Sequence, residues 1–172
     1  MPCIGMRINC CKIRGNNGDV FMATKYELRY LTQEFYKEYD SKNYPEIEHK
    51  AERPYMVFLV KIEDNTYAIP FRTNVKHNYC YKFKKSSRDT NCSTGLDYSK
   101  VVIVNKEKYI GEAATIDNKE YIELNSKYYF IIKQFKGYVE GYIRFVNGKA
   151  NEFEAKKYKY STLQYFHKEL NL

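Results

Sequence analysis

The sequence predicts an α+β domain in which helices pack against a small, mostly antiparallel sheet. Three observations support this fold class. A continuous apolar segment at 55–62 is followed by a turn and a second strand-like segment at 66–71, as expected of a β-hairpin. A third apolar segment covers residues 101–104. The last third of the chain instead carries apolar residues at three- and four-residue steps, which is typical of helices.

The chain has the size and composition of one globular domain, with 172 residues of which 44% are hydrophobic. We expect a single domain over 1–172, with 1–19 as an N-terminal extension or edge strand and 20–172 as the core. No apolar segment approaches the roughly 20 residues that span a bilayer, and the first residues lack the apolar block of a signal peptide. These features favour a cytoplasmic protein without a membrane partner.

The N-terminal part predicts one helix. Residues 6–13 are compatible with a short strand, which a turn rich in Gly and Asn follows. From Thr24 onward, Tyr, Leu and Phe side chains recur at roughly helical spacing. Thr24 as N-cap and Glu27 as its capping-box partner predict a helix that ends near Tyr39, before a polar segment and Pro45.

The hairpin is the clearest element of the sequence. Residues 55–62 are expected to form a central buried strand, 63–65 a tight turn and 66–71 the second arm. Pro70 cannot donate to a ladder, so regular pairing should loosen there and the following side chains should leave the sheet. Residues 72–95 are predicted to form a long loop.

The remaining segments add strands and helices. Residues 101–104 predict another buried strand, and 109–110 continue the sheet. A long helix is expected to start at Asn125 or Ser126 and to end at Gly148, where a left-handed residue fits. A final short helix over 162–170 should direct three side chains to the core, namely Leu163, Phe166 and Leu170.

Charge and aromatic content point to a nucleic-acid partner. The net charge is +8, and the chain contains 19 Tyr and 10 Phe. Lysine and arginine neutralise phosphates, while aromatic rings stack on unpaired bases. A protein from an AT-rich genome would also be rich in Lys, Tyr, Asn and Ile whatever its function, so composition by itself leaves both interpretations open.

Cysteine and histidine usage gives no sign of a metal site. The five cysteines are an odd number without a Cys-x-x-Cys pair, and the three histidines lack metal-ligand spacing. We expect free thiols, no structural metal and no cofactor.

The segment 69–77 holds the densest collection of reactive groups. Cleaving RNA without metal requires assistance to the 2′-OH, positive charge on the phosphorane and an acid for the leaving 5′-oxygen. Arg72 and Lys76 supply charge, Thr73 supplies a hydroxyl, and His77 has an ordinary pKa suited to proton transfer. Thr-Asn after a strand is also common turn chemistry, and a lone loop histidine is often structural.

Downstream of this segment, basic and aromatic residues alternate up to position 88. We expect the basic side chains to hold the RNA backbone and the rings to stack on bases; these residues are Tyr79, Tyr81, Lys82, Phe83, Lys84, Lys85 and Arg88. The alternative is that one or two of the rings belong to the core.

The order of these elements resembles the toxins of type III toxin–antitoxin systems, the ToxN, AbiQ, CptN and TenpN proteins. The resemblance is carried by RPYMVFLVKIEDNTYAIPFRTN and GLDYSKVVIV and extends from about residue 21 to the end. It is strongest in the hairpin that ends in Ile-Pro-Phe-x-Thr, and closest to the CptN and TenpN branches.

Membership in this family would imply a compact barrel-like sheet with helices, related to the MazF and Kid toxins. It would also imply a sequence-specific, metal-independent endoribonuclease that leaves 2′,3′-cyclic phosphate and 5′-OH ends on mRNA. The partner would be an antitoxin RNA of repeated pseudoknots, which the toxin processes and then binds in a closed assembly.

The resemblance also suggests catalytic positions. Thr73 aligns with the family's active-site Ser or Thr, whereas Arg72 stands where a family Thr would be. Arg53 takes the place of a Lys that contacts the scissile region, and Lys76 replaces a downstream Lys after a shift of one residue. Since these departures leave the general base and acid unassigned, His77 stays a candidate for proton transfer.

Two further positions belong to the expected RNA-binding surface. His49 falls near a family Tyr, and Asn74 follows the active-site hydroxyl. The working hypothesis is therefore an RNA-cleaving toxin. The alternatives are a non-catalytic single-stranded RNA-binding module that uses the same surface and a DNA-associated phage-defence protein.

Overall fold

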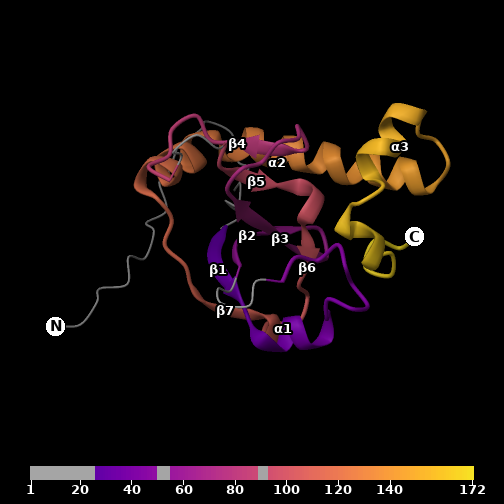
Figure 1. Cartoon of the computed structure of the whole chain (residues 1–172), viewed down its shortest axis with the longest axis horizontal. Coiled ribbons are helices and arrows are strands. Elements are labelled where there is room, and N and C mark those ends of the chain that lie inside the picture. Colours follow the sequence, from indigo (N-terminus) through magenta and orange to yellow (C-terminus); the bar gives the residue numbers. More distant parts are fainter. Residues whose placement is uncertain (1–25, 50–54, 89–92) are drawn as a thin grey trace, which may run out of the picture.

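The computed structural model describes residues 26–49, 55–88 and 93–172 (Figure 1). Over these residues the protein has the expected α+β fold, with seven strands in an antiparallel sheet and three α-helices. The sheet order is β4-β5-β3-β2-β1-β7, and β6 also pairs with β3. The sheet is therefore open, with β4 and β7 at its two edges. The strands are β1 Glu27–Leu31, β2 Met56–Ile62, β3 Asn65–Arg72, β4 Cys80–Lys82, β5 Gly95–Asp97, β6 Val102–Ile103 and β7 Ile110–Ala113.

The predicted hairpin is confirmed. β2 and β3 pair antiparallel from Val57 opposite Pro70 to Ile62 opposite Asn65. Glu63 adopts a left-handed φ of 55°, which lets the chain reverse in a short turn. The hairpin lies at the centre of the sheet because its apolar side chains are buried on both faces.

Pairing was expected to loosen at Pro70, and the ladder with β2 does end there, but β3 continues to Arg72. On its other edge, Tyr67 and Ala68 pair with β6, whereas Phe71 and Arg72 pair with β5. Pro70 lies between these two segments, so its missing N–H coincides with the change of partner. The chain leaves the sheet at Thr73, three residues later than the proline.

The helix predicted over 24–39 is wrong in its first half. Glu27–Leu31 forms β1, which pairs with both β2 and β7. The helix α1 spans Gln33–Glu38, with Thr32 as its N-cap, and the expected cap Thr24 lies outside the described residues. Tyr26, Leu28 and Tyr30 also alternate, and this strand period prevails because the edge of β2 needs a partner.

The long helix α2 covers the sheet. It spans Asn118–Val146 and starts at Asp117, whose carboxylate accepts the N–H groups of Lys119 and Glu120, rather than at residue 125 or 126. Its end at Gly148 is as predicted, with φ 68°. The Phe135 ring lies 5.2 Å from that of Tyr67 on β3. Figure 1 shows α2 along the top and α1 at the opposite end.

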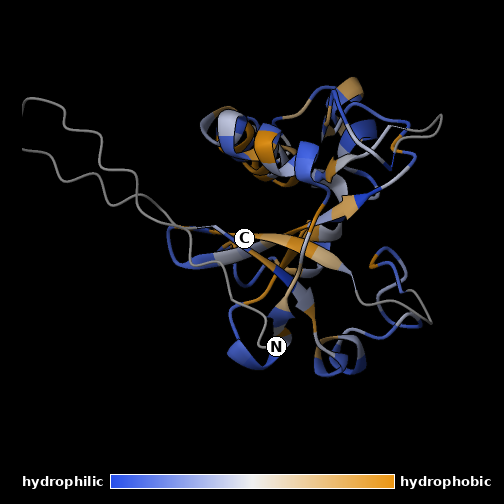
Figure 2. Ribbon diagram, turned by 90° about the vertical axis from the view of Figure 1, so that its left-hand side faces the viewer, coloured by the Kyte–Doolittle hydropathy of each residue, from blue (hydrophilic) through white to orange (hydrophobic). Residues whose placement is uncertain are grey.

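The segments after α2 differ from expectation. The helix α3, Glu152–Tyr158, was not predicted, although Asn151 and Glu154 form a capping box. The expected helix over 162–170 is a single 3-10 turn, η3, at Thr162–Tyr165. Leu163 and Phe166 are fully buried, as predicted, and Leu170 is partly buried. Figure 2 shows hydrophobic strands in the middle of the molecule, between α2 above and α1 below.

The segment 72–95 contains more structure than the predicted loop. β4 pairs with β5, so that Tyr81 faces Leu96 across the ladder. β5 leads directly into a 3-10 turn, η1, at Tyr98–Lys100, and then into β6, which is shorter than the predicted strand. A second such turn, η2, at Glu107–Tyr109 precedes β7, which confirms that the sheet continues at this point.

Candidate active site

The end of β3 delivers the reactive segment to the surface. Arg72 is the last residue of the strand and pairs with Gly95 of β5. Thr73 and Asn74 are exposed, and Asn74 turns the chain with φ 59°. Val75 then returns to the interior, where its N–H donates to the Ser93 carbonyl at 2.9 Å. The Thr73 side chain therefore projects from a tight corner that is held at both ends.

A buried carboxylate holds the side chains of this corner in place. Asp97, at the end of β5, is fully buried. Its Oδ2 accepts from Arg72 Nη1 at 2.6 Å and contacts His77 Nε2 at 3.3 Å. Its Oδ1 accepts from the Ser99 hydroxyl at 2.6 Å and from the Ser99 N–H at 2.9 Å. Burial raises the pKa of Asp97, but the hydrogen bonds from His77, Ser99 and Arg72 together lower it below its ordinary value.

Arg72 is engaged by a second carboxylate. Its Nη2 lies 2.5 Å from Glu48, and Glu48 also accepts the Tyr55 hydroxyl at 2.7 Å. The guanidinium therefore bridges two carboxylates, which hold it in one orientation and compensate its charge. This geometry gives Arg72 a positioning role within the cluster.

His77 experiences two opposed influences. The hydrogen bond to Asp97 is the main cause that raises its pKa to about 9, which favours the imidazolium. The N–H of Tyr79 donates to Nδ1 at 3.2 Å, which requires that nitrogen to be unprotonated. The Asp97 contact involves a full charge and is the stronger of the two. We therefore take His77 as a cation at neutral pH.

The cluster does not have the geometry of a serine nucleophile. Ser99 Oγ lies 3.5 Å from His77 Nε2, the same nitrogen that Asp97 contacts. In a Ser-His-Asp triad the carboxylate and the hydroxyl contact opposite ring nitrogens. Ser99 is also buried and donates its proton to Asp97, so the arrangement does not provide a hydroxyl nucleophile.

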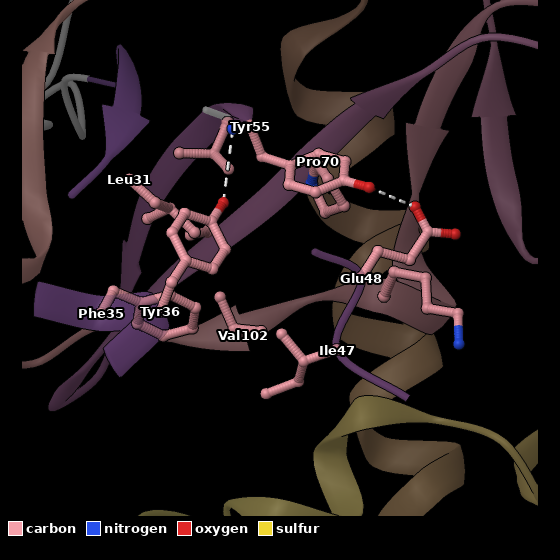
Figure 3. A pocket seen from close by; sticks show the side chains of 11 residues that line it. Leu31, Phe35, Tyr36, Ile47, Glu48, Tyr55, Pro70 and Val102 are labelled. Atoms are coloured by element: carbon pink, nitrogen blue, oxygen red, sulfur yellow. Dashed lines mark hydrogen bonds between the residues drawn. The ribbon is translucent and has the colours of Figure 1, made fainter. Parts of the chain in front are cut away.

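A pocket adjoins the cluster on the other side of Glu48 (Figure 3). Its walls come from α1, β2, β3 and β6, and include Phe35, Val57 and Pro70. Its charged lining residues are Glu48 and Lys100, and the Lys100 ammonium lies 2.9 Å from Glu46. Since both charges are compensated within the chain, we assign no ligand to this pocket.

Several predicted RNA-binding residues lie where a ligand could meet them. Asn74, Lys76, Lys84, Lys85 and Arg88 are exposed, and Lys82 is partly exposed. Arg88 also forms an ion pair with the fully buried Glu120 at 2.7 Å, which ties the loop to α2. Arg53 lies outside the described residues.

His49 and Tyr79 have partners inside the chain. His49 contacts the Tyr39 carbonyl at 2.7 Å and the Ile47 carbonyl at 2.9 Å, so its ring is anchored within its own loop. The Tyr79 ring stacks on His77 at 5.4 Å and lies 5.6 Å from the Lys157 ammonium.

Tyr81 and Phe83 are core residues, which corrects the expectation that they stack on bases. Tyr81 is 7% exposed and Phe83 is 4% exposed. The Tyr81 hydroxyl donates to Glu123 at 2.7 Å, and the Phe83 ring stacks on Phe71. The alternation of Tyr81 and Phe83 around Lys82 is the strand signal that could have revealed this burial.

Sequence reasoning missed Asp97, Ser99 and Glu48. Asp97 stands out in the sequence as a lone acid between apolar residues of a strand, which is the one signal that could have found it. Nothing in the local pattern connects it with Arg72 or His77.

Among residues 26–49, 55–88 and 93–172, no three His, Cys, Asp or Glu side chains gather so that they could hold a metal ion. No helix in the same part of the chain is long and apolar enough to cross a membrane. Comparisons with protein-family models, curated proteins and solved structures found no match.

Proposed function

We propose that the protein is a metal-independent endoribonuclease toxin whose active site lies at the end of β3. The observation that carries this proposal is the buried Asp97 carboxylate, which holds Arg72 and His77 beside the exposed Thr73 and Lys76. An exposed hydroxyl, an exposed ammonium and an imidazole thus follow one another within five residues at this end of β3, and these are the groups that RNA cleavage without metal requires.

The reaction follows from these groups. The Thr73 hydroxyl orients the 2′-OH, whose oxygen attacks phosphorus while the bond from phosphorus to the 5′-oxygen breaks. The Lys76 ammonium stabilises the charge that develops on the phosphorane. The imidazolium of His77 donates a proton to the leaving 5′-oxygen from Nδ1, which must first release the Tyr79 N–H because Nε2 contacts Asp97. The 2′-OH proton passes to solvent. The products are a 2′,3′-cyclic phosphate and a 5′-OH end.

The remaining parts of the proposal concern fold and partners. The sheet is open, so the expected barrel is not seen, and we propose that the fold is an open variant of the MazF and Kid toxin fold. A small antitoxin RNA of pseudoknot repeats would be processed by this site and then inhibit it in a closed toxin–RNA assembly. The excess of basic side chains supports an RNA partner in both roles.

The test is cleavage of an A-rich RNA by the purified protein in EDTA, with analysis of the fragment ends. Thr73→Val, which removes the hydroxyl but keeps the shape, should lower the rate by about two to three decades. Thr73→Ser is the matched control and should retain activity. Both variants should keep the wild-type melting temperature, because Thr73 is exposed.

Two outcomes would contradict the proposal. Cleavage by Thr73→Val at the wild-type rate would show that the active site is elsewhere. RNA binding by the wild-type protein without any cleavage would favour the alternative, a non-catalytic single-stranded RNA-binding module, which the same exposed basic residues support.

A further inference from the structure

One face of α2 carries large apolar side chains that the core does not use. Tyr129 is 75% exposed, Ile122 is 61% exposed and Phe130 is 54% exposed. Tyr129 and Phe130 follow Ile122 by seven and eight residues, two turns along the helix. Ile122 and Tyr129 lie on the side opposite Leu124 and Ile131, which are fully buried, and Phe130 lies beside them. The core of the domain therefore does not explain the two aromatic rings.

Exposed lysines belong to the same helix and to the loop packed against it. Lys127 and Lys133 are exposed on the same helix. Lys84 and Lys85 come from the loop after β4, which lies against α2 because their N–H groups donate to Glu123 at 3.0 and 3.4 Å. Four exposed lysines thus belong to α2 and to the loop that contacts it.

The acidic side chains of this region are turned inward. Glu120 is fully buried and forms hydrogen bonds with Ser86 and Arg88. Glu123 accepts the Tyr81 hydroxyl in addition to the backbone N–H groups of the loop. The exposed surface therefore combines aromatic rings with uncompensated positive charge, which fits a polyanion with flat hydrophobic groups.

This face is connected with the candidate active site. The Phe130 ring lies 6.3 Å from that of Tyr81 on β4, and β4 follows His77 after two residues. A strand bound at Thr73 can thus extend along β4 toward α2. Figure 1 shows β4 beside α2 at the top of the molecule.

We propose that Tyr129 and Phe130 are the base-stacking platform of the protein and bind single-stranded RNA. Unpaired bases stack on the two rings, while Lys84, Lys85 and Lys133 hold the phosphates. Paired bases hide their faces in a helix, so the platform selects unpaired segments. This inference rests on the proposed RNA-directed function, but it does not require cleavage.

The experiment uses the full chain and a 2′-O-methyl oligonucleotide, which cannot be cleaved because its 2′-oxygen is blocked. Dissociation constants are measured by fluorescence anisotropy. Tyr129→Ala and Phe130→Ala should each weaken binding about 5- to 150-fold. Phe153→Ala is the matched control, since Phe153 is 76% exposed but lies on α3, and it should bind normally.

An abasic oligonucleotide keeps the phosphates but lacks the bases, so it separates the contribution of stacking to affinity from that of charge. It should bind wild type and Tyr129→Ala equally, because no base is present to stack on the ring. A preference of wild type over Tyr129→Ala for the abasic strand would overturn the platform.

Three other results would also overturn it. If Tyr129→Ala and Phe130→Ala both bind the intact strand with normal affinity, the two rings do not contact the RNA. A melting temperature that falls in Tyr129→Ala but not in Phe153→Ala would mean that the ring packs within the chain. A wild-type dimer in sedimentation experiments that Tyr129→Ala abolishes would mean that a second copy covers this face.

The platform and the nuclease proposal can fail separately. If wild type binds through Tyr129 but leaves natural RNA intact, the stacking platform is supported and the nuclease proposal is contradicted. If wild type cleaves RNA and Tyr129→Ala binds it with normal affinity, only the proposal of a stacking platform is contradicted.

Discussion

At the scale of single residues, the candidate site depends on Asp97. A fully buried carboxylate is costly unless charged and polar donors surround it. Here Arg72, His77 and Ser99 supply those donors, so the electrostatic requirement of one side chain orients the others. The same contacts explain why Arg72 acts through position, since its charge is shared between Asp97 and Glu48.

The pH dependence of stability should report on His77. Its pKa is raised in the folded protein from the ordinary 6.5 to about 9, so the protonated form stabilises the fold. This contribution is complete below pH 6.5 and is lost as the pH rises through about 9. We expect the free energy of unfolding of wild type to fall across this window more steeply than that of His77→Gln, as measured by urea denaturation.

Parallel profiles of wild type and His77→Gln would contradict this expectation. They would mean that the hydrogen bond from the Tyr79 N–H keeps the imidazole neutral throughout. His77 could then not serve as the acid for the leaving oxygen.

At the scale of elements, the close packing of α2 and α3 depends on a glycine. The Tyr158 hydroxyl of α3 lies 2.0 Å from the position that a Cβ at Gly141 would occupy. Tyr158 cannot easily move away, because it is buried among aromatic rings that include Tyr138 and Tyr142. Gly137, one turn earlier, faces open space.

Gly141→Ala and Gly137→Ala should therefore change stability in opposite directions. Overpacking costs about 1–3 kcal/mol, which exceeds the roughly 1 kcal/mol that alanine gains over glycine in a helix. Gly137→Ala keeps the helical gain without the clash. Urea denaturation of the two variants tests this, and an equal shift in both would show that α3 does not press on α2 at this point.

At the scale of the whole molecule, charge is distributed unevenly. Several acids point inward or pair locally, such as Asp97, Glu120 and Glu123, while lysines near β4 and α2 face outward. Elsewhere lysines are partly compensated, since Lys106 and Lys108 share the carboxylate of Glu38 of α1. A polyanion should consequently prefer the β4 side of the molecule.

The salt dependence of RNA affinity tests this distribution. Each phosphate contact contributes about 0.7 to 0.9 to the slope of log affinity against log salt concentration. Replacing Lys82, Lys84 and Lys85 with Ala should flatten the slope by about 2. Replacing Lys106 and Lys108 with Ala is the control and should leave it unchanged. Equal flattening in both variants would mean that RNA contacts the molecule without preference for this face.

Local patterns were sufficient for part of this architecture. The hairpin over 55–71, its turn and the end of α2 at Gly148 were predicted correctly, because apolar period and turn chemistry act over a few residues. The segment with Thr73 and His77 could likewise be singled out from its side chains alone. The start of α2 was missed by more than two turns, since Asp117 rather than Asn125 or Ser126 caps the helix.

The tertiary structure decided everything that depends on distant partners. Glu27–Leu31 is a strand because β2 and β7 flank it, and Tyr81 is a core residue because α2 covers it. Asp97 meets Arg72 across 25 positions of sequence, a contact that no local period encodes. Sequence patterns specify which face of an element is apolar, whereas the identity of the neighbour is set by how the whole chain buries those faces together.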